Sequence, residues 1–139
     1  GFEANPYPDP GTGAKPYTIG YGTTVYPDGK AVTMQDPPIT KEVALEYLLD
    51  HVNKHISPEL NKLLPQLKQH QFDALCSFIY NLGIGNFKSS SLLADIKKNA
   101  AGDVITADFN KWVKAAGKIL QGLVKRRWSE AHLYNTGLY

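Results

Sequence analysis

Bulky and small side chains alternate in the first part of the chain, between residues 16 and 34. The bulky positions are Tyr17, Ile19 and Tyr21, and the small or polar positions are Thr18, Gly20 and Gly22. A repeat of two residues is typical of a β-strand, in which successive side chains point to opposite faces. The stretch YPDGK, residues 26–30, supplies the proline, aspartate and glycine that turns favour. Residues 16–34 are therefore predicted to form a small antiparallel sheet.

The period becomes helical after Thr40, a suitable N-cap, because apolar residues then recur three or four positions apart. Pro58 is expected to break or restart the first helix. The predicted helices span residues 41–56, 58–64, 67–82, 90–99, 106–117 and 118–134. The helix at 67–82 is apolar on several sides, which indicates a buried central helix. On the last helix, the residues expected to face inward are Leu120, Leu123, Val124, Trp128 and Ala131.

These elements predict an α+β fold in a single domain over residues 1–139, with a sheet lobe at about 1–38 and a larger helical lobe at about 40–139. A cleft between the lobes would be the natural place for a ligand. No apolar run reaches the ~18 residues of a membrane span. The single cysteine, Cys76, excludes an internal disulfide and lies in an apolar run, so we expect it to be buried and inert.

The net charge of +2 is unevenly distributed along the chain. Residues 1–59 carry a net charge of −4, and residues 60–139 carry +6. A basic half suggests an anionic partner, which could be a nucleic acid, a membrane surface or a cell-wall polymer, although it could equally be a solvated basic surface. Lys125, Arg126 and Arg127 form its densest basic run and are expected at the surface.

One carboxylate, Asp9, stands alone in a stretch rich in glycine and proline that leads into the predicted strand. The strand face that carries Thr18 is otherwise built of glycines, which often mark the close approach of a ligand. An extended sugar chain would suit this surface, and glycoside hydrolysis normally uses two carboxyl groups. The simpler alternatives remain open: Asp9 could be an ordinary turn residue, and Thr18 an ordinary β-branched strand residue.

Other constellations are weaker. His51 and His55 stand four residues apart, a spacing that can bind zinc, but no third ligand is evident in the sequence. The glycines of residues 11–22 do not follow a strand and open a helix, so they do not form a phosphate-binding loop. We therefore predict neither a metal site nor a cofactor.

Three separate motifs resemble the phage-type lysozymes, glycoside hydrolase family 24. They are YPDPGTGAKPYTIGYGTT at residues 7–24, QFDALCSFIYNLGIGNFKSSSLL at 71–93, and FNKWVKAAGKILQGLVKRR at 109–127. The resemblance covers nearly the whole chain. It implies a lysozyme-like fold and hydrolysis of the β-1,4 bond between N-acetylmuramic acid and N-acetylglucosamine in peptidoglycan. It also implies an inverting mechanism, with a glutamate as general acid and an aspartate and a threonine that position the attacking water.

Carried over residue by residue, the resemblance makes Asp9 and Thr18 catalytic. It also implies five substrate-binding residues, which are Tyr7, Gly20, Gly22, Tyr80 and Ser90. The residues Gly1 and Phe2 resemble the segment that directly follows the family's glutamate. We therefore expect the general acid, on an N-terminal helix, immediately before Gly1. Glu3 is six residues before Asp9 rather than the family's nine, and it is expected to be a surface residue unless it substitutes as the acid.

The function expected from the resemblance is that of a bacteriolytic muramidase, which would act as a monomer on the glycan strands of peptidoglycan. Such an enzyme would be made in the cytoplasm of the host bacterium and act on the cell wall in the periplasm, by an export route that the sequence does not reveal. The main alternative is a non-catalytic peptidoglycan-binding module that lacks the general acid. A basic nucleic-acid binder is a third and more remote possibility, and no nucleic-acid partner is expected.

Overall fold

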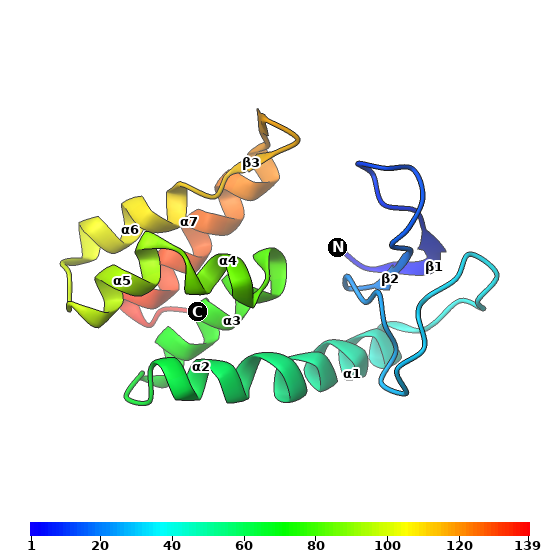
Figure 1. The fold of residues 1–139 in the computed structure, drawn as a ribbon, viewed down its shortest axis with the longest axis horizontal. Coiled ribbons are helices and arrows are strands. Elements are labelled where there is room, and N and C mark those ends of the chain that lie inside the picture. The colour runs from blue at the N-terminus through cyan, green and yellow to red at the C-terminus, as the bar shows by residue number, and fades with distance from the viewer. The chain divides into compact units, whose positions relative to one another are not determined.

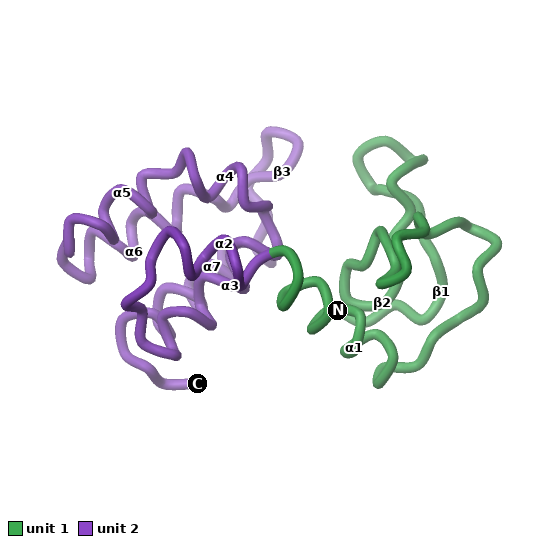
Figure 2. The backbone as a smooth tube through the Cα atoms, turned by 60° about the horizontal axis from the view of Figure 1, so that its bottom comes forward, with its two compact units in different colours: residues 1–55 green, residues 56–139 purple.

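The computed structural model describes residues 1–139 and divides into two compact units. Unit 1 comprises Gly1–His55 and unit 2 comprises Ile56–Tyr139 (Figure 2). The expected lobe boundary lay at about residues 38–40, whereas the structure places it after His55. The physical reason is that the first helix packs against the strands of the N-terminal unit and therefore belongs to it.

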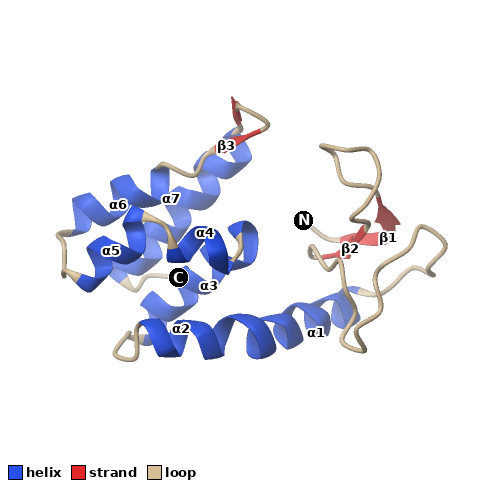
Figure 3. Ribbon diagram, viewed as in Figure 1, coloured by secondary structure: helices blue, strands red, loops and turns tan.

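Unit 1 contains a two-stranded antiparallel sheet, made of β1 (Glu3–Tyr7) and β2 (Thr18–Gly20) (Figure 3). The sequence pattern did not reveal β1, because its residues EANPY do not alternate. Within residues 16–34, only β2 is a strand, and the predicted sheet is otherwise reduced to two isolated bridges. These bridges join Ile19 to Thr23 and Val25 to Ala31. The predicted turn at residues 26–30 is confirmed, with Gly29 at a φ of 90°.

The core of unit 1 forms where β2 meets the helix α1 (Lys41–His51). Gly20 has a φ of 68°, and a Cβ atom built there would lie 3.0 Å from the Cβ of Ala44 and 3.2 Å from the Cδ1 of Ile39. Ile19 and Ala44 are fully buried, and Val32 is nearly so. Glycine at position 20 therefore lets the helix approach the strand closely.

The expected start of α1 is confirmed, since the Thr40 hydroxyl accepts a hydrogen bond from the Val43 amide at 3.2 Å. The expected break at Pro58 takes another form. The helix continues through a π-helical turn, η1 (Val52–Ile56), into α2 (Ser57–Leu63). A proline has no amide hydrogen for the i−4 bond, and a widened π turn accommodates this loss without ending the helix.

Unit 2 is helical. Its further helices are α3 (Gln69–Leu82), α4 (Ile84–Lys88), α5 (Ser91–Lys97), α6 (Gly102–Asn110) and α7 (Gln121–Thr136) (Figure 1). The predicted burial of α3 is confirmed, because α3 packs along α7 and α4. Phe78 of α3 is the centre of an aromatic cluster with Phe87, Phe109 and Trp112. No helix of the structure has the length and apolar character needed to cross a membrane.

The predicted helix at residues 106–117 is wrong at its C-terminal end. Helix α6 already ends at Asn110, and a short hairpin follows, with β3 (Lys114–Ala115) paired to β4 (Lys118–Ile119). Ala116 and Gly117 have φ angles of 52° and 77°. Two successive positive φ angles are typical of the tight turn in a two-residue hairpin, so the Ala-Gly pair reverses the chain.

The expected inward face of α7 is also wrong in part. Ala131 is buried as expected, but Trp128 is 60% exposed and Leu120 is 45% exposed. Arg127 and Glu130 are buried in their place. The hydrophobic pattern predicted the wrong face because the buried face of α7 carries two charged side chains. These two side chains pair with each other.

Candidate functional site

Asp9 organises the loop between β1 and β2. Its carboxylate Oδ2 accepts hydrogen bonds from the amides of Gly11 at 3.1 Å and Thr12 at 3.0 Å. Its own backbone bonds to Ala14 and Gly13, at 2.9 and 2.7 Å. Asp9 is thus the turn residue that the simpler interpretation describes. A carboxylate has about four acceptor positions, however, so the second oxygen remains able to hold a water or a ligand.

Thr18 lies directly opposite Tyr7 in the two-stranded sheet. Side chains at such paired positions project from the same face and lie next to each other. Tyr7 ends β1 two residues before Asp9, and Thr18 begins β2, so these three residues gather at one end of the sheet. All three are half-buried, as befits side chains that are held in place but remain accessible. Unit 1 therefore brings together Tyr7, Asp9 and Thr18.

The two glycines beyond Thr18 differ from each other. Gly20 is buried, and the space beside it is filled by Ala44 and Ile39, so the bare strand face expected there is covered by protein rather than open to a ligand. Gly22 is exposed and has a φ of 105°, a conformation that favours glycine for backbone reasons alone. Neither position offers a side chain to a substrate.

Tyr80 and Ser90 belong to unit 2. Tyr80 is half-buried on α3. Ser90 is 7% exposed, and its hydroxyl donates to the Phe87 carbonyl at 2.7 Å and accepts from the Leu93 amide at 3.2 Å. This is the N-cap of α5, so the hydroxyl serves the end of the helix, and the expected substrate contact of Ser90 stays a prediction.

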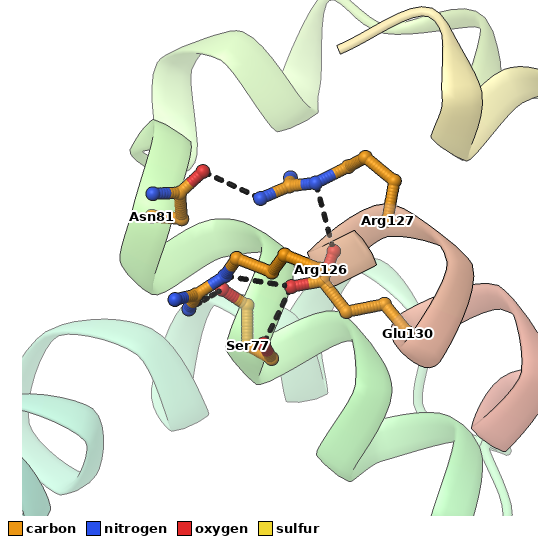
Figure 4. Close-up of polar contacts among 5 residues, drawn as sticks. All are labelled: Ser77, Asn81, Arg126, Arg127 and Glu130. Carbon is orange, nitrogen blue, oxygen red and sulfur yellow. Dashed lines mark hydrogen bonds and ion pairs between the residues drawn. The ribbon is translucent and has the colours of Figure 1, made fainter. Parts of the chain in front are cut away.

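A largely buried charged cluster, which no sequence pattern predicted, joins α3 to α7 (Figure 4). It consists of Ser77, Asn81, Arg126, Arg127 and Glu130. The Glu130 Oε2 atom accepts from the Ser77 hydroxyl at 2.5 Å and from the Arg126 Nε at 3.1 Å. Arg126 also donates to the Ser77 carbonyl at 3.0 Å, and Arg127 Nη2 donates to the Asn81 side chain at 2.5 Å.

The electrostatics of the cluster follow from its burial. Arg127 is completely buried, and its Nε lies 3.2 Å from Glu130 Oε1 without the alignment of a hydrogen bond, so that contact is mainly Coulombic. Burial lowers the pKa of Arg127 and raises the pKa of Glu130, while the two arginines and Ser77 oppose the rise. The expected surface position of Arg127 is therefore wrong. The spacing R-R-x-x-E, which aligns charges on one helix face, is the signal that could have indicated the cluster.

The remaining reactive side chains show no catalytic setting. Burial, with a smaller contribution from Asp73, raises the pKa of the Cys76 thiol to about 12, so the thiol is a poor nucleophile near neutral pH. The rings of His51 and His55 lie 5.0 Å apart. The structure contains no group of three or more histidine, cysteine, aspartate or glutamate side chains arranged to hold a metal ion.

The comparisons with known proteins agree on one family. The family model described as phage lysozyme matches residues 1–130. The endolysin of Bacillus phage PZA is 41% identical, in an alignment that covers 88% of this chain and 45% of that protein. The chain thus spans less than half the length of this relative.

Solved structures agree with the sequence matches. An endolysin from Escherichia coli O157:H7 phage FAHEc1 has a TM-score of 0.83 at 33% identity, covering 100% of this chain and 87% of that chain. A mutant of the lysozyme of phage P22 has a TM-score of 0.76 at 31% identity, covering 96% and 88%. The expected α+β, lysozyme-like fold is confirmed by these neighbours.

Proposed function

Because the chain belongs to the phage lysozyme family, we propose that it hydrolyses the β-1,4 bond between N-acetylmuramic acid and N-acetylglucosamine in peptidoglycan. The observation that carries the proposal is the grouping of Asp9 with Tyr7 and Thr18 at one end of the sheet in unit 1. The similar proteins named above are endolysins and a lysozyme. The protein would act on the bacterial cell wall, with glycan strands as its partner.

The proposed mechanism is inverting. In this class a carboxylate and a second carboxyl group face the scissile bond from opposite sides, ~6.5–9.5 Å apart, which leaves room for the attacking water. Asp9 would act as the base, since one of its oxygens is fixed by two amides while the other can accept a water proton. The Thr18 hydroxyl would hold the same water. Tyr7, on the same face as Thr18, would contact the sugar ring.

We propose that the general acid is a glutamate that would stand immediately before Gly1. The test therefore uses the chain extended by a glutamate and its preceding helical turn, beside an identical chain extended with glutamine. The glutamate form should clear a peptidoglycan suspension, and the glutamine form should lose about 10²–10⁴-fold or more in rate. Equal lysis by the two forms, together with loss of lysis in Glu3→Gln, would identify Glu3 as the acid and contradict the proposed position.

Two further variants in the glutamate form test the water-holding residues. Asp9→Asn keeps an acceptor for the loop amides but removes the base. Thr18→Val keeps the strand residue but removes the hydroxyl. Both should fold, as judged by circular dichroism, and lose most of their turnover without loss of glycan binding. The product anomer, followed by NMR, should be inverted. A chain that binds peptidoglycan but stays inactive in every form would instead be a non-catalytic binding module.

A further inference from the structure

Unit 1 contains a pocket of about 470 Å³ that is lined by the turn at residues 26–30, by the segment 36–39 and by helix α1. None of the residues proposed for catalysis lines it. Two tyrosines, Tyr26 and Tyr47, belong to its lining. Their ring centres lie 5.5 Å apart, and the planes of the rings meet at 67°. The two rings therefore form two walls of the pocket that stand at a steep angle to each other.

Two carboxylates of the lining lie close to the same tyrosine. The Tyr26 hydroxyl donates to Asp36 Oδ2 at 2.7 Å. Burial raises the pKa of Tyr26 most, the hydrogen bond to Asp36 adds to the rise, and the charges of Asp36 and Asp28 contribute further. Both carboxylates are therefore within electrostatic range of the Tyr26 hydroxyl, which stays protonated and keeps its hydrogen bond.

The carboxylates keep acceptor positions that a ligand can use. Thr33 donates to Asp36 twice, from its amide to Oδ2 at 2.9 Å and from its hydroxyl to Oδ1 at 2.6 Å. The hydrogen bonds from Thr33, and then that from Tyr26, lower the pKa of Asp36, so this carboxyl is ionised at neutral pH. A carboxylate has about four acceptor positions, which leaves about one on Asp36. Asp28 accepts one hydrogen bond, from the Lys30 amide at 2.9 Å, so most of its positions are open.

Lys30 is the cation of the lining. Its side chain is exposed and forms no ion pair with Asp28 or Asp36. Two aspartates and one lysine give the lining a net charge of −1. The pocket thus combines aromatic walls with negative charge that the protein does not fully compensate.

From this arrangement we propose that the pocket binds a primary alkylammonium group, as carried by a lysine side chain or by a free alkylamine. The rings of Tyr26 and Tyr47 attract a cation through their electron-rich faces. The open acceptor positions of Asp28 and Asp36 take the N–H donors of the ammonium group. The half-buried Ile39, which also lines the pocket, offers an apolar contact to the alkyl chain. All of these groups belong to unit 1, so the inference does not depend on the proposed hydrolysis.

The test is an NMR titration of the ¹⁵N-labelled chain with n-butylammonium at neutral pH and constant ionic strength. The backbone amides of Lys30 and Thr33 report binding, because they donate to the two carboxylates of the pocket. n-Butylammonium should shift both signals and saturate, whereas 1-butanol, the matched neutral molecule, should leave them in place. Tetramethylammonium, a cation without an N–H donor, should bind more weakly than n-butylammonium. Tighter binding of tetramethylammonium would contradict the role of the carboxylates.

Three variants assign the binding to the pocket. Tyr47→Leu removes one aromatic wall and should weaken n-butylammonium binding about two- to fivefold. Asp28→Asn should weaken it by a similar factor. Because Asp28 is exposed and asparagine retains an acceptor for the Lys30 amide, this variant should fold even if Tyr47→Leu does not. Lys30→Gln removes the competing cation and should strengthen binding, whereas Lys15→Gln, the same change at an exposed lysine outside the pocket, should not.

A second titration distinguishes the two sources of the amine. It compares acetyl-glycyl-lysyl-glycinamide with the same peptide in which norleucine replaces lysine. Binding of the lysine peptide at least as tight as that of n-butylammonium supports a peptide side chain, and failure of this peptide to bind assigns the pocket to free amines. The inference is overturned if n-butylammonium shifts neither amide, if 1-butanol shifts them equally, or if Asp28→Asn and Lys30→Gln both leave the affinity unchanged. Every readout is binding, so loss of cell-wall hydrolysis would not affect the outcome.

Discussion

At the scale of single residues, the carboxyl groups of Asp95 on α5 and Asp108 on α6 shift each other's pKa in opposite directions. Burial favours the neutral form of Asp108, but hydrogen bonds from Asp95, Ser91 and Lys111 outweigh it and lower its pKa. The pKa of Asp95 is raised, first by its hydrogen bond to Asp108. Asp108 Oδ2 is buried and accepts no hydrogen bond from another group of the protein. The directions of the two pKa shifts assign the first proton that the pair binds to Asp95.

The two carboxyl groups make the free energy of unfolding depend on pH in opposite directions. Because the pKa of Asp95 is raised in the folded state, its contribution is complete below the unfolded pKa, near 3.8, and is lost as the pH rises through the folded pKa. The contribution of Asp108 is present above that value and is lost as the pH falls. The pair thus contributes most between the lowered pKa of Asp108 and the raised pKa of Asp95.

Asp95→Asn should remove the loss of stability that occurs as the pH rises through the folded-state pKa of Asp95. The reason is that an amide can donate to Asp108 without losing a proton. The urea midpoint of the variant should exceed that of the parent at pH 7 and should no longer fall as the pH rises from 4 to 7. Glu46→Gln, a change at an exposed carboxyl of α1, is the control and should follow the parent. If the two variants have the same pH profile, the carboxyl pair does not titrate as described.

The sequence could indicate candidate site residues only where their role is visible in the neighbouring residues of the chain. Asp9 and Thr18 were proposed as site residues because an isolated acid and a glycine-flanked threonine stand out from their neighbours. Gly20 and Ser90 were expected at the substrate, yet Gly20 faces Ala44 and Ser90 caps α5. A glycine or a serine can have a role in the backbone conformation as readily as a role in ligand binding. The neighbouring residues in the folded structure show which of the two roles it has.

At the scale of the helices, α3 and α7 are held together by charge as well as by apolar packing. The pair between Arg127 and Glu130 is almost completely enclosed, with the guanidinium 5.1 Å from the ring centre of Phe78. Unit 2 also has an ion pair at its surface, between Lys88 and Glu59 at 3.2 Å, whose side chains are 48% and 39% exposed. The two pairs allow a direct comparison of a buried and an exposed contact.

Glu130→Gln should destabilise the protein by about 3–5 kcal/mol, because the fully buried Arg127 would lose the charge that compensates it. Glu59→Gln, the same change at the exposed pair, should cost about 0–1 kcal/mol. Urea unfolding followed by circular dichroism measures both values. Similar costs for the two variants would mean that the buried cluster contributes no more than a surface pair.

Helices were predictable where their ends are marked locally. Thr40 caps α1, Ser90 caps α5 and Gly137 ends α7 in the left-handed region. Strand β1 and the hairpin at residues 114–119 were not predicted, because short strands are defined by their partners rather than by their own residues. The face of α7 was misjudged for the same reason, since Arg127 can be buried only where Glu130 and the α3 side chains accompany it.

At the scale of the whole molecule, the two units carry opposite net charges. Unit 1 has 4 lysines and 7 acidic residues, and unit 2 has 11 basic and 6 acidic residues, which gives net charges of −3 and +5. Arg127 contributes nothing to the surface, and Arg126 is half-buried against Glu130. The exposed cations of the hairpin and of the start of α7 are Lys114, Lys118 and Lys125.

Neutralising these three lysines to glutamine should reduce binding to isolated cell walls, which are anionic, and should flatten its dependence on salt. Exposed charges act over a screening length of ~8 Å at physiological ionic strength, so added salt should weaken the parent far more than the variant. The control replaces Lys15, Lys30 and Lys41 of unit 1, which are also exposed. If cell-wall binding depends on salt equally in the parent and in the unit 2 variant, these lysines are ordinary solvated surface residues.

The charged cluster of Figure 4 also has a consequence for synthesis, because its two halves leave the ribosome at different times. The hydrogen bonds of the cluster that join α3 to α7 connect residues 46 to 53 positions apart, and the later partners all lie on α7. During synthesis, α3 therefore emerges long before the side chains that cover it. A nascent chain that ends before Gln121 leaves Ser77 and Asn81 without their α7 partners, however complete its earlier helices are. Unit 2 can therefore complete this cluster only after α7 has been synthesised.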